Sequence, residues 1–287
     1  MPEEKRTIRV VTRKSPLAMR QTEIAIEALG AACPHWDFEL IPMSTTGDER
    51  LAWSLETSGG KGLFTSALEE AIVKGDGDLA VHSSKDLPTE MPEGVVLAGF
   101  LPRAPAGDLL IIRESVTEPA LIATSSPRRR AQLKAVYPNA AWKEIRGNVN
   151  TRLRKISEGE AEATVMAQAG LYRLGIDHYE GLRFLPIPIT RSVPAAGQGA
   201  IGLQVRAEDG PVFASLLCEQ TARAVHLERA YLAAMGGGCH SATAAHFTDG
   251  QLHVFDEATG YRCLEVPEEV SHLNPTGMTE WVAEQVS

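Results

Sequence analysis

Apolar residues recur along this chain with two different spacings, which predict strands and helices in alternation. Strand-like runs cover residues 8–12, 38–43, 79–82 and 95–100. A helical pattern covers residues 64–74, and Ser15-Pro16 supplies an N-cap followed by proline at the first helical position. Strands that alternate with helices favour a mainly parallel sheet.

The alternation then restarts and predicts a second α/β domain. Strands are expected over residues 109–112, 121–124, 142–146 and 163–166, with helices from residue 127 and over 149–157. Pro- and Gly-containing segments, 101–107 and 187–199, bracket this part. They are typical of crossovers that insert one domain into another.

After a strand over residues 200–205, a long amphipathic helix over 222–235 leads into a glycine run and Cys239. Short strands and a helix ending near residue 286 follow. We predict an α/β protein with two doubly wound domains and a small α+β C-terminal domain. The expected boundaries are 1–100 with 198–219, then 101–197, then 220–287, the last carrying Cys239.

The length of 287 residues suits two or three domains. No apolar run reaches the roughly 18 residues of a membrane span, and the first residues do not resemble a signal peptide, so no membrane partner is expected. The four cysteines lie far apart without a C-x-x-C pair, which argues against a disulfide framework or a zinc ribbon. We expect a cytoplasmic protein.

The net charge of −9 argues against a general nucleic-acid binder. Residues 124–156 nevertheless contain nine Lys or Arg and a single acid, Glu144. This stretch indicates either a site for a small anion or a solvated basic face, and charge alone does not decide between them.

Two segments in this stretch have the pattern of anion sites. Thr124-Ser125-Ser126 follows a strand and precedes a helix whose first turn contains Arg128-Arg129-Arg130. A helix N-terminus favours anions and opposes cations, so we favour an anion site over simple capping by Ser126 with surface arginines. Arg146-Gly147-Asn148 repeats the strand, turn and cap, with Arg152 in the next helix. Two such segments suggest a ligand with several carboxylates.

Ser83, Lys85 and Asp86 follow an apolar strand, at the end where open α/β sheets place ligands. A carboxylate there could hold a heteroaromatic N–H and stabilise positive charge on it. The alternative is an exposed ion pair of little energetic value. Cys239 follows three glycines, so we expect an exposed thiol that can be alkylated, although most single cysteines are inert. No metal site is predicted, because no second ligand pair has metal spacing.

Together these motifs resemble the hydroxymethylbilane synthase (porphobilinogen deaminase) family, in the same order from about residue 8 to Cys239. The stretches that carry the resemblance include Thr12-Arg13-Lys14-Ser15-Pro16, His82-Ser83-Ser84-Lys85-Asp86, Arg146-Gly147-Asn148-Val149-Asn150, Pro194-Ala195-Ala196-Gly197-Gln198 and Gly237-Gly238-Cys239. The resemblance implies that the first two domains are similar to type II periplasmic binding proteins.

The resemblance also implies a cytoplasmic, monomeric transferase of haem-type tetrapyrrole biosynthesis. The family joins four porphobilinogen units into a linear tetrapyrrole, releasing ammonia each time, on one covalent dipyrromethane per chain, here on Cys239. Asp86 is the implied catalytic carboxylate. The implied cofactor-binding residues besides Cys239 are Ser83, Lys85, Thr124, Ser125, Ser126, Arg128, Arg129, Arg146, Gly147 and Gln198. The implied substrate-binding residues are Arg13, Ser15, Arg152 and Arg173.

Two segments depart from the family pattern. Arg103-Ala104-Pro105-Ala106-Gly107-Asp108 lacks one basic residue, and His240-Ser241-Ala242-Thr243 lacks a usual proline. Two rival functions remain open. A non-catalytic binding protein would leave Cys239 unmodified and tolerate Asp86→Asn, whereas nucleic-acid binding through residues 124–156 would show steep salt dependence.

Overall fold

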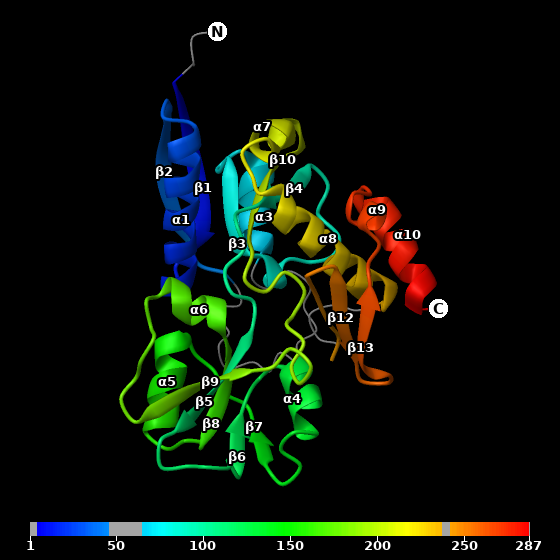
Figure 1. Cartoon of the computed structure of the whole chain (residues 1–287). Coiled ribbons are helices and arrows are strands. Elements are labelled where there is room, and N and C mark those ends of the chain that lie inside the picture. Colours follow the sequence, from blue (N-terminus) through cyan, green and yellow to red (C-terminus); the bar gives the residue numbers. More distant parts are fainter. Residues whose placement is uncertain (1–4, 46–64, 237–241, 287) are drawn as a thin grey trace. The chain divides into compact units, whose positions relative to one another are not determined.

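The computed structural model describes residues 5–45, 65–236 and 242–286 (Figure 1). Contacts divide these residues into two compact units. Unit 1 takes the described residues of Met1–Leu51, Gly60–Arg103 and Ala200–Ala222. Unit 2 takes those of Ala104–Gly199 and Arg223–Ser287.

Unit 1 contains a five-stranded sheet in the order β2-β1-β3-β10-β4. The strands are β1 (Arg6–Arg13), β2 (Trp36–Met43), β3 (Leu79–Ser83), β4 (Val95–Phe100) and β10 (Ile201–Arg206). β1 runs parallel to β2 and β3, whereas β10 runs antiparallel to β3 and β4. The helices of this unit include α1 (Pro16–Ala32), α3 (Ser66–Lys74) and α7 (Gly210–Ala214). Alternate strand residues such as Ile8, Val10 and Leu203 are fully buried and form its core.

The predicted start of α1 is confirmed. Ser15 accepts a hydrogen bond from the backbone N–H of Ala18 at 3.3 Å, and Pro16 occupies the first turn. This capping satisfies one backbone donor that the helix itself leaves unpaired.

Unit 2 begins with a second five-stranded sheet in the order β7-β6-β8-β5-β9. Its elements are β5 (Asp108–Arg113), β6 (Leu121–Ala123), α4 (Pro127–Lys134), β7 (Ala141–Lys143), α5 (Val149–Ser157), β8 (Ala163–Ala167), α6 (Gln168–Arg173) and β9 (Leu182–Ile187). β5 runs antiparallel to β8 and β9, as β10 does to its neighbours in the first sheet. The chain thus leaves the first sheet after β4, builds the second and returns as β10. The insertion of one domain into another stays a prediction.

The rest of unit 2 is a three-stranded antiparallel sheet with helices. It contains α8 (Glu219–Ala234), β11 (Ala244–Thr248), β12 (Gln251–Asp256), β13 (Gly260–Glu265), α9 (Glu268–Ser271) and α10 (Pro275–Val286). Leu227 and Tyr231 of α8 pack with Leu252, Val254 and Val282 in its core. The predicted fold class, α/β with a small α+β part, is confirmed. The three sets of domain boundaries stay a prediction.

The strand expected at 142–146 is shorter than predicted and ends at Lys143. Beyond that point the Ser125 hydroxyl donates to the Ile145 carbonyl at 2.7 Å and accepts from its N–H at 3.2 Å. A side chain therefore replaces the neighbouring strand there, which ends the ladder. Within the described ranges, no helix combines the length and apolar character needed to cross a membrane.

Candidate functional site

Arg128 and Arg129 lie in the first turn of α4, where the sequence places an anion site. Ser126 caps this helix by accepting from the N–H of Arg129 at 3.3 Å, as the alternative interpretation of this segment expects. The two side chains are not displayed on the surface, because they are only 7% and 8% exposed. Both turn inward to Asp108, the first residue of β5.

Asp108 binds both guanidinium groups at once. Its Oδ2 accepts from Arg128 Nη2 and its Oδ1 from Arg129 Nη2, each at 2.8 Å. Burial alone would raise the pKa of Asp108, but the charges of Arg128 and Arg129 outweigh burial and lower that pKa well below its ordinary value. Two guanidinium groups and one carboxylate leave one net positive charge in this buried cluster.

The hydroxyl groups before α4 shape the turn itself. Thr124 Oγ1 accepts from the N–H of Ser126 at 3.2 Å, and Ser125 bonds to the backbone of Ile145. These contacts hold the strand end and the helix start in register. A contact of Thr124, Ser125 or Ser126 with a ligand stays a prediction.

The second predicted anion site has the expected cap and turn. Asn148 caps α5 by accepting from the N–H of Thr151 at 2.9 Å. Gly147 has a φ of +117°, and a Cβ there would lie 2.6 Å from Thr151 Cγ2, so the turn requires glycine. Arg152 Nε donates to the Gly147 carbonyl at 2.7 Å, and Arg146 pairs with Glu144 at 3.3 Å.

Arg173, at the end of α6, is a buried cation with 9% exposure. Its Nη2 donates to the Gly199 carbonyl at 2.6 Å. Burial lowers the pKa of Arg173 to about 10, and within the described ranges no carboxylate forms an ion pair with it. Unit 2 therefore holds a second buried positive charge, which suits an anionic ligand.

The predicted residues of unit 1 lie at one edge of its sheet. β1 and β3 are parallel neighbours, so Arg13 at the end of β1 and Ser83 at the end of β3 share that edge. Ser83 exchanges hydrogen bonds with Gln21 at 2.9 and 3.1 Å. Lys85 and Asp86 form a short 3-10 turn directly after β3 and are half-buried. In the described part of unit 1, no hydrogen bond or ion pair engages the Asp86 carboxylate.

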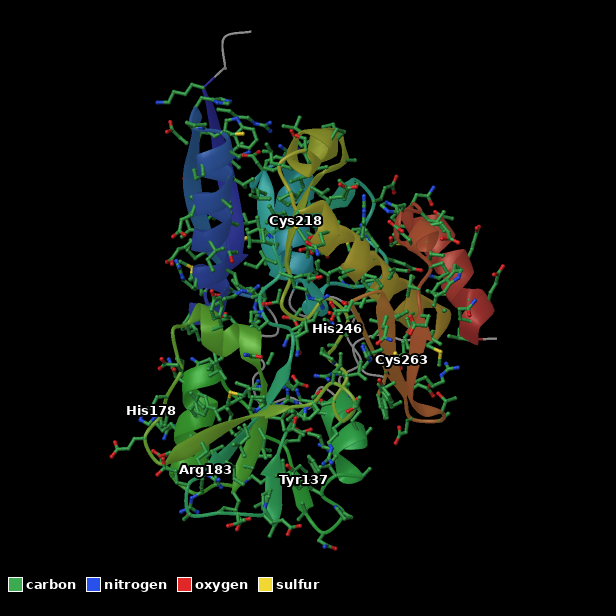
Figure 2. All side chains as sticks on the ribbon, viewed as in Figure 1. Tyr137, His178, Arg183, Cys218, His246 and Cys263 are labelled. Atoms are coloured by element: carbon green, nitrogen blue, oxygen red, sulfur yellow. The ribbon has the colours of Figure 1, made fainter. Side chains whose placement is uncertain are left out.

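Cys239 lies outside the described residues, so its predicted role stays a prediction. None of the three described cysteines forms a disulfide: Cys33 is buried, Cys218 is half-buried and Cys263 is exposed on β13 (Figure 2). The described ranges contain no group of three His, Cys, Asp or Glu that could hold a metal ion.

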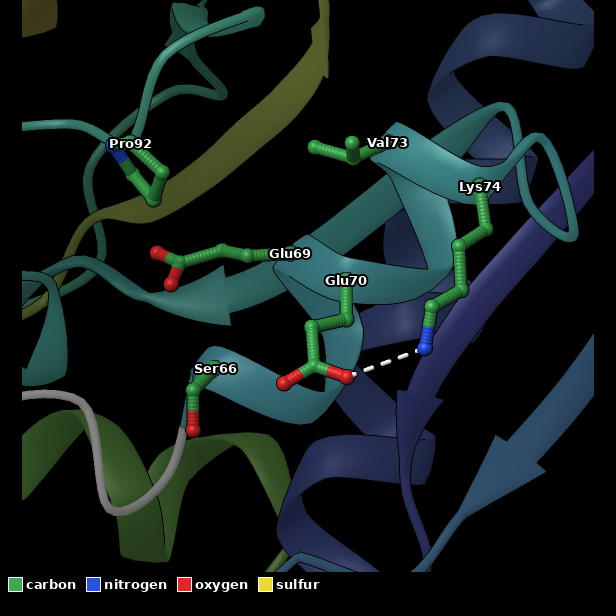
Figure 3. A pocket seen from close by; sticks show the side chains of 6 residues that line it. All are labelled: Ser66, Glu69, Glu70, Val73, Lys74 and Pro92. Atoms are coloured by element: carbon green, nitrogen blue, oxygen red, sulfur yellow. Dashed lines mark hydrogen bonds and ion pairs between the residues drawn. The ribbon is translucent and has the colours of Figure 1, made fainter.

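A separate pocket of about 220 Å³ lies on unit 1 beside α3 (Figure 3). It is lined by Ser66, Glu69, Glu70, Val73, Lys74 and Pro92. Lys74 and Glu70 form an ion pair at 3.1 Å on its wall. None of the predicted site residues lines it.

The buried carboxylates of unit 2 that the sequence analysis did not single out include Asp108 and Glu228. Asp108 could have been noticed as the one charged residue opening the apolar run Leu109-Leu110-Ile111-Ile112. Glu228 of α8 is fully buried and accepts from the N–H groups of Gly197 at 2.7 Å and Phe247 at 2.9 Å. No local pattern marks Glu228, since its partners are 31 and 19 residues away.

Several solved structures are similar over most of the chain. The BvgS periplasmic VFT2 domain of Bordetella pertussis has a TM-score of 0.44 and 15% identity, covering 73% of this chain and 85% of that one. The BenM effector binding domain with benzoate has a TM-score of 0.44 and 14% identity, covering 76% and 91%.

Proteins related by sequence have a much higher identity to this chain. Porphobilinogen deaminase of Streptococcus sanguinis is 41% identical over 249 residues, which is 84% of this chain and 81% of the relative. The proteins of the same name from Desulforudis audaxviator and Xylella fastidiosa are 42% and 43% identical, covering 86% and 83% of this chain and 82% and 80% of the relatives. Residues 8–214 match the family described as "Porphobilinogen deaminase, dipyromethane cofactor binding domain". This chain therefore belongs to the porphobilinogen deaminase family.

Proposed function

We propose that the chain joins four porphobilinogen molecules into the linear tetrapyrrole hydroxymethylbilane, releasing ammonia at each step, on a covalent dipyrromethane. The observation that carries this function is the family match over residues 8–214, whose description names the dipyrromethane cofactor. In this reaction the enzyme is a transferase of tetrapyrrole biosynthesis. Family membership favours it over a non-catalytic binding protein.

The described residues fit a cofactor with several carboxylates. Arg173 is buried without a carboxylate partner in the described part of the chain, and the cluster of Arg128, Arg129 and Asp108 has an uncompensated positive charge. Buried charge of this kind is costly unless it is paired. Each pyrrole unit brings an acetate and a propionate, which would supply the missing negative charge.

When bound, the cofactor supplies the free pyrrole carbon to which new units are added. In the proposal, the Cys239 sulfur attaches it. The other residues proposed to hold it are Ser83, Lys85, Thr124, Ser125, Ser126, Arg128, Arg129, Arg146, Gly147 and Gln198. Guanidinium groups suit this task because they bind carboxylates in bidentate fashion.

Asp86 is the proposed catalytic residue. Its carboxylate is half-buried and has no partner in the described part of unit 1, so it can accept hydrogen bonds from pyrrole N–H groups. Negative charge there stabilises positive charge that develops on the ring and can receive a proton. Arg13, Ser15, Arg152 and Arg173 are proposed to bind the carboxylates of the incoming substrate.

We further propose that the enzyme acts in the cytoplasm as a monomer, without a nucleic-acid or membrane partner. The net charge of −9 and the absence of cysteine pairs with redox or zinc spacing support this setting.

Intact-protein mass spectrometry tests the proposed function. We expect the full chain to carry a mass excess of two linked pyrrole units, which Cys239→Ser abolishes together with turnover. Cys263→Ser is the matched control, because Cys263 is the exposed cysteine of β13 and we expect that variant to keep the excess. An unmodified chain that still turns over porphobilinogen would refute the Cys239 assignment, and an unmodified chain without turnover would refute the function.

A further inference from the structure

Asp108 receives hydrogen bonds from four side chains of unit 2. Its Oδ2 accepts from Arg128 Nη2 at 2.8 Å and from the Ser192 hydroxyl at 2.9 Å. Its Oδ1 accepts from Arg129 Nη2 at 2.8 Å and from Gln198 Nε2 at 2.9 Å. One carboxylate without exposed surface thus anchors three side chains that are proposed to hold the cofactor.

We propose that Asp108 is a positioning residue that fixes Arg128, Arg129 and Gln198 in the orientation in which they hold carboxylates of the dipyrromethane. This inference rests on the proposed function. Asp108 would act through these side chains and would not touch the cofactor itself.

The donors of the two arginines support this role. A guanidinium has five N–H groups. Beyond Asp108, Arg128 donates to the carbonyl of Val193, and Arg129 donates to the carbonyl of Val165 at 2.9 Å. Arg129 Nε is buried and has no hydrogen-bond partner in the described part of the chain. Asp108 therefore fixes the two groups while leaving donors and one net positive charge for a ligand carboxylate.

The pattern of donors makes the isosteric variant Asp108→Asn informative. Each oxygen of Asp108 faces two donors, so the amide NH₂ of asparagine would face two donors in either orientation. In each orientation, the arginine that faces the NH₂ group loses its hydrogen-bond acceptor. The side chain keeps its volume, so the variant tests the carboxylate and not the packing.

The test measures the turnover of porphobilinogen per cofactor-loaded chain. Intact-protein mass spectrometry gives the loaded share, which is the fraction of chains that carry the cofactor. The melting temperature is measured on the same samples. We expect Asp108→Asn to lower either turnover per loaded chain or the loaded share about tenfold, the effect of losing one charge-assisted hydrogen bond. Asp78→Asn is the matched control, because Asp78 is also buried and binds two arginines, Arg9 and Arg206, in unit 1. We expect that variant to melt earlier but to keep its loaded share and turnover.

Equal turnover and loading in Asp108→Asn and the wild-type chain would overturn the inference, as would equal losses in the Asp108 and Asp78 variants. A wild-type chain with neither cofactor nor turnover would overturn the proposed function, and the inference with it. If Asp108→Asn does not fold, Ser192→Ala decides: removing that single donor should lower turnover per loaded chain about threefold with little change in melting temperature. Unchanged turnover there would reject the role of Asp108.

Discussion

Asp86 is the single residue on which the proposed chemistry depends most. Its carboxylate is half-buried and directly follows the β3 strand end. We expect Asp86→Asn to slow turnover about 100-fold or more, because a neutral amide neither stabilises positive charge nor accepts a proton. The melting temperature should stay unchanged. Glu90→Gln, an exposed carboxylate of the same segment, is the control and should keep full turnover. Wild-type turnover of Asp86→Asn would remove its proposed role.

Arg173 allows stability and function to be separated at one position. Its buried guanidinium has no ion-pair partner in the described ranges, so its desolvation opposes folding. We expect Arg173→Met to melt at or above the wild-type temperature, whereas the KM for porphobilinogen rises about 10-fold to 100-fold as a ligand carboxylate loses its charged partner. Arg154→Met, at an exposed arginine paired with Glu158, should change neither quantity. A clear loss of stability in Arg173→Met would contradict this reasoning.

At the scale of elements, Asp78 ties three strands of the first sheet together. It accepts from the backbone and side chain of Arg9 on β1 and from Arg206 on β10, and it directly precedes β3. Burial opposes its ionisation, but the hydrogen bonds from Arg9 and Arg206 outweigh burial and lower the pKa of Asp78 from 3.8 to about 2. A lowered carboxyl pKa stabilises the fold above the unfolded pKa and loses this effect as pH falls through the folded pKa.

We expect the free energy of unfolding of the wild-type chain to exceed that of Asp78→Asn by about 2 kcal/mol at neutral pH. This gap should close between pH about 4 and 2, because protonated Asp78 resembles asparagine. Urea unfolding at a series of pH values measures it. Asp37→Asn, at an exposed ion pair with Lys5, should show almost no gap. A gap that stays constant down to pH 2 would contradict the role of Asp78.

Elements with a local signal were predictable from the sequence. Helix α5 spans Val149–Ser157, the predicted bounds, because Asn148 provides a cap and apolar residues recur at helical spacing. Strand β9 was not predicted, since Pro186 argues against a strand. Among the described strands, β9 pairs with β5 alone and is an edge strand, where a missing N–H is tolerated.

The site residues, too, were predictable from the sequence only where their signal is local. Ser15 and Asn148 were predicted as caps, and capping by Ser126 was the alternative interpretation of its segment. Their signal is local, since each accepts from the N–H three residues further on. The inward turn of Arg128 and Arg129 could not be predicted, because Asp108 lies 20 and 21 residues earlier and reaches them only through the folded sheet. Local residue spacing predicts caps and turns, whereas buried ion pairs depend on tertiary packing.

At the scale of the whole molecule, the basic stretch of an acidic chain is largely paired. Arg154 pairs with Glu158 and Lys155 with Glu160, while Arg128 and Arg129 are buried against Asp108. These pairs reduce the net positive charge of the stretch, within a chain whose net charge is −9. Neither original interpretation of residues 124–156, a solvated basic face or an open anion site, anticipated this pairing.

The place of β10 between β3 and β4 has a consequence for how the protein is made. The ribosome releases β1 to β4 first, but their sheet lacks its inner antiparallel strand until residues 201–206 emerge. The second sheet needs only Asp108 to Ile187, so it has all its strands earlier. We therefore expect the nascent N-terminal segment to present unpaired strand edges, which favour aggregation, until β10 emerges, and the second sheet to be able to fold first.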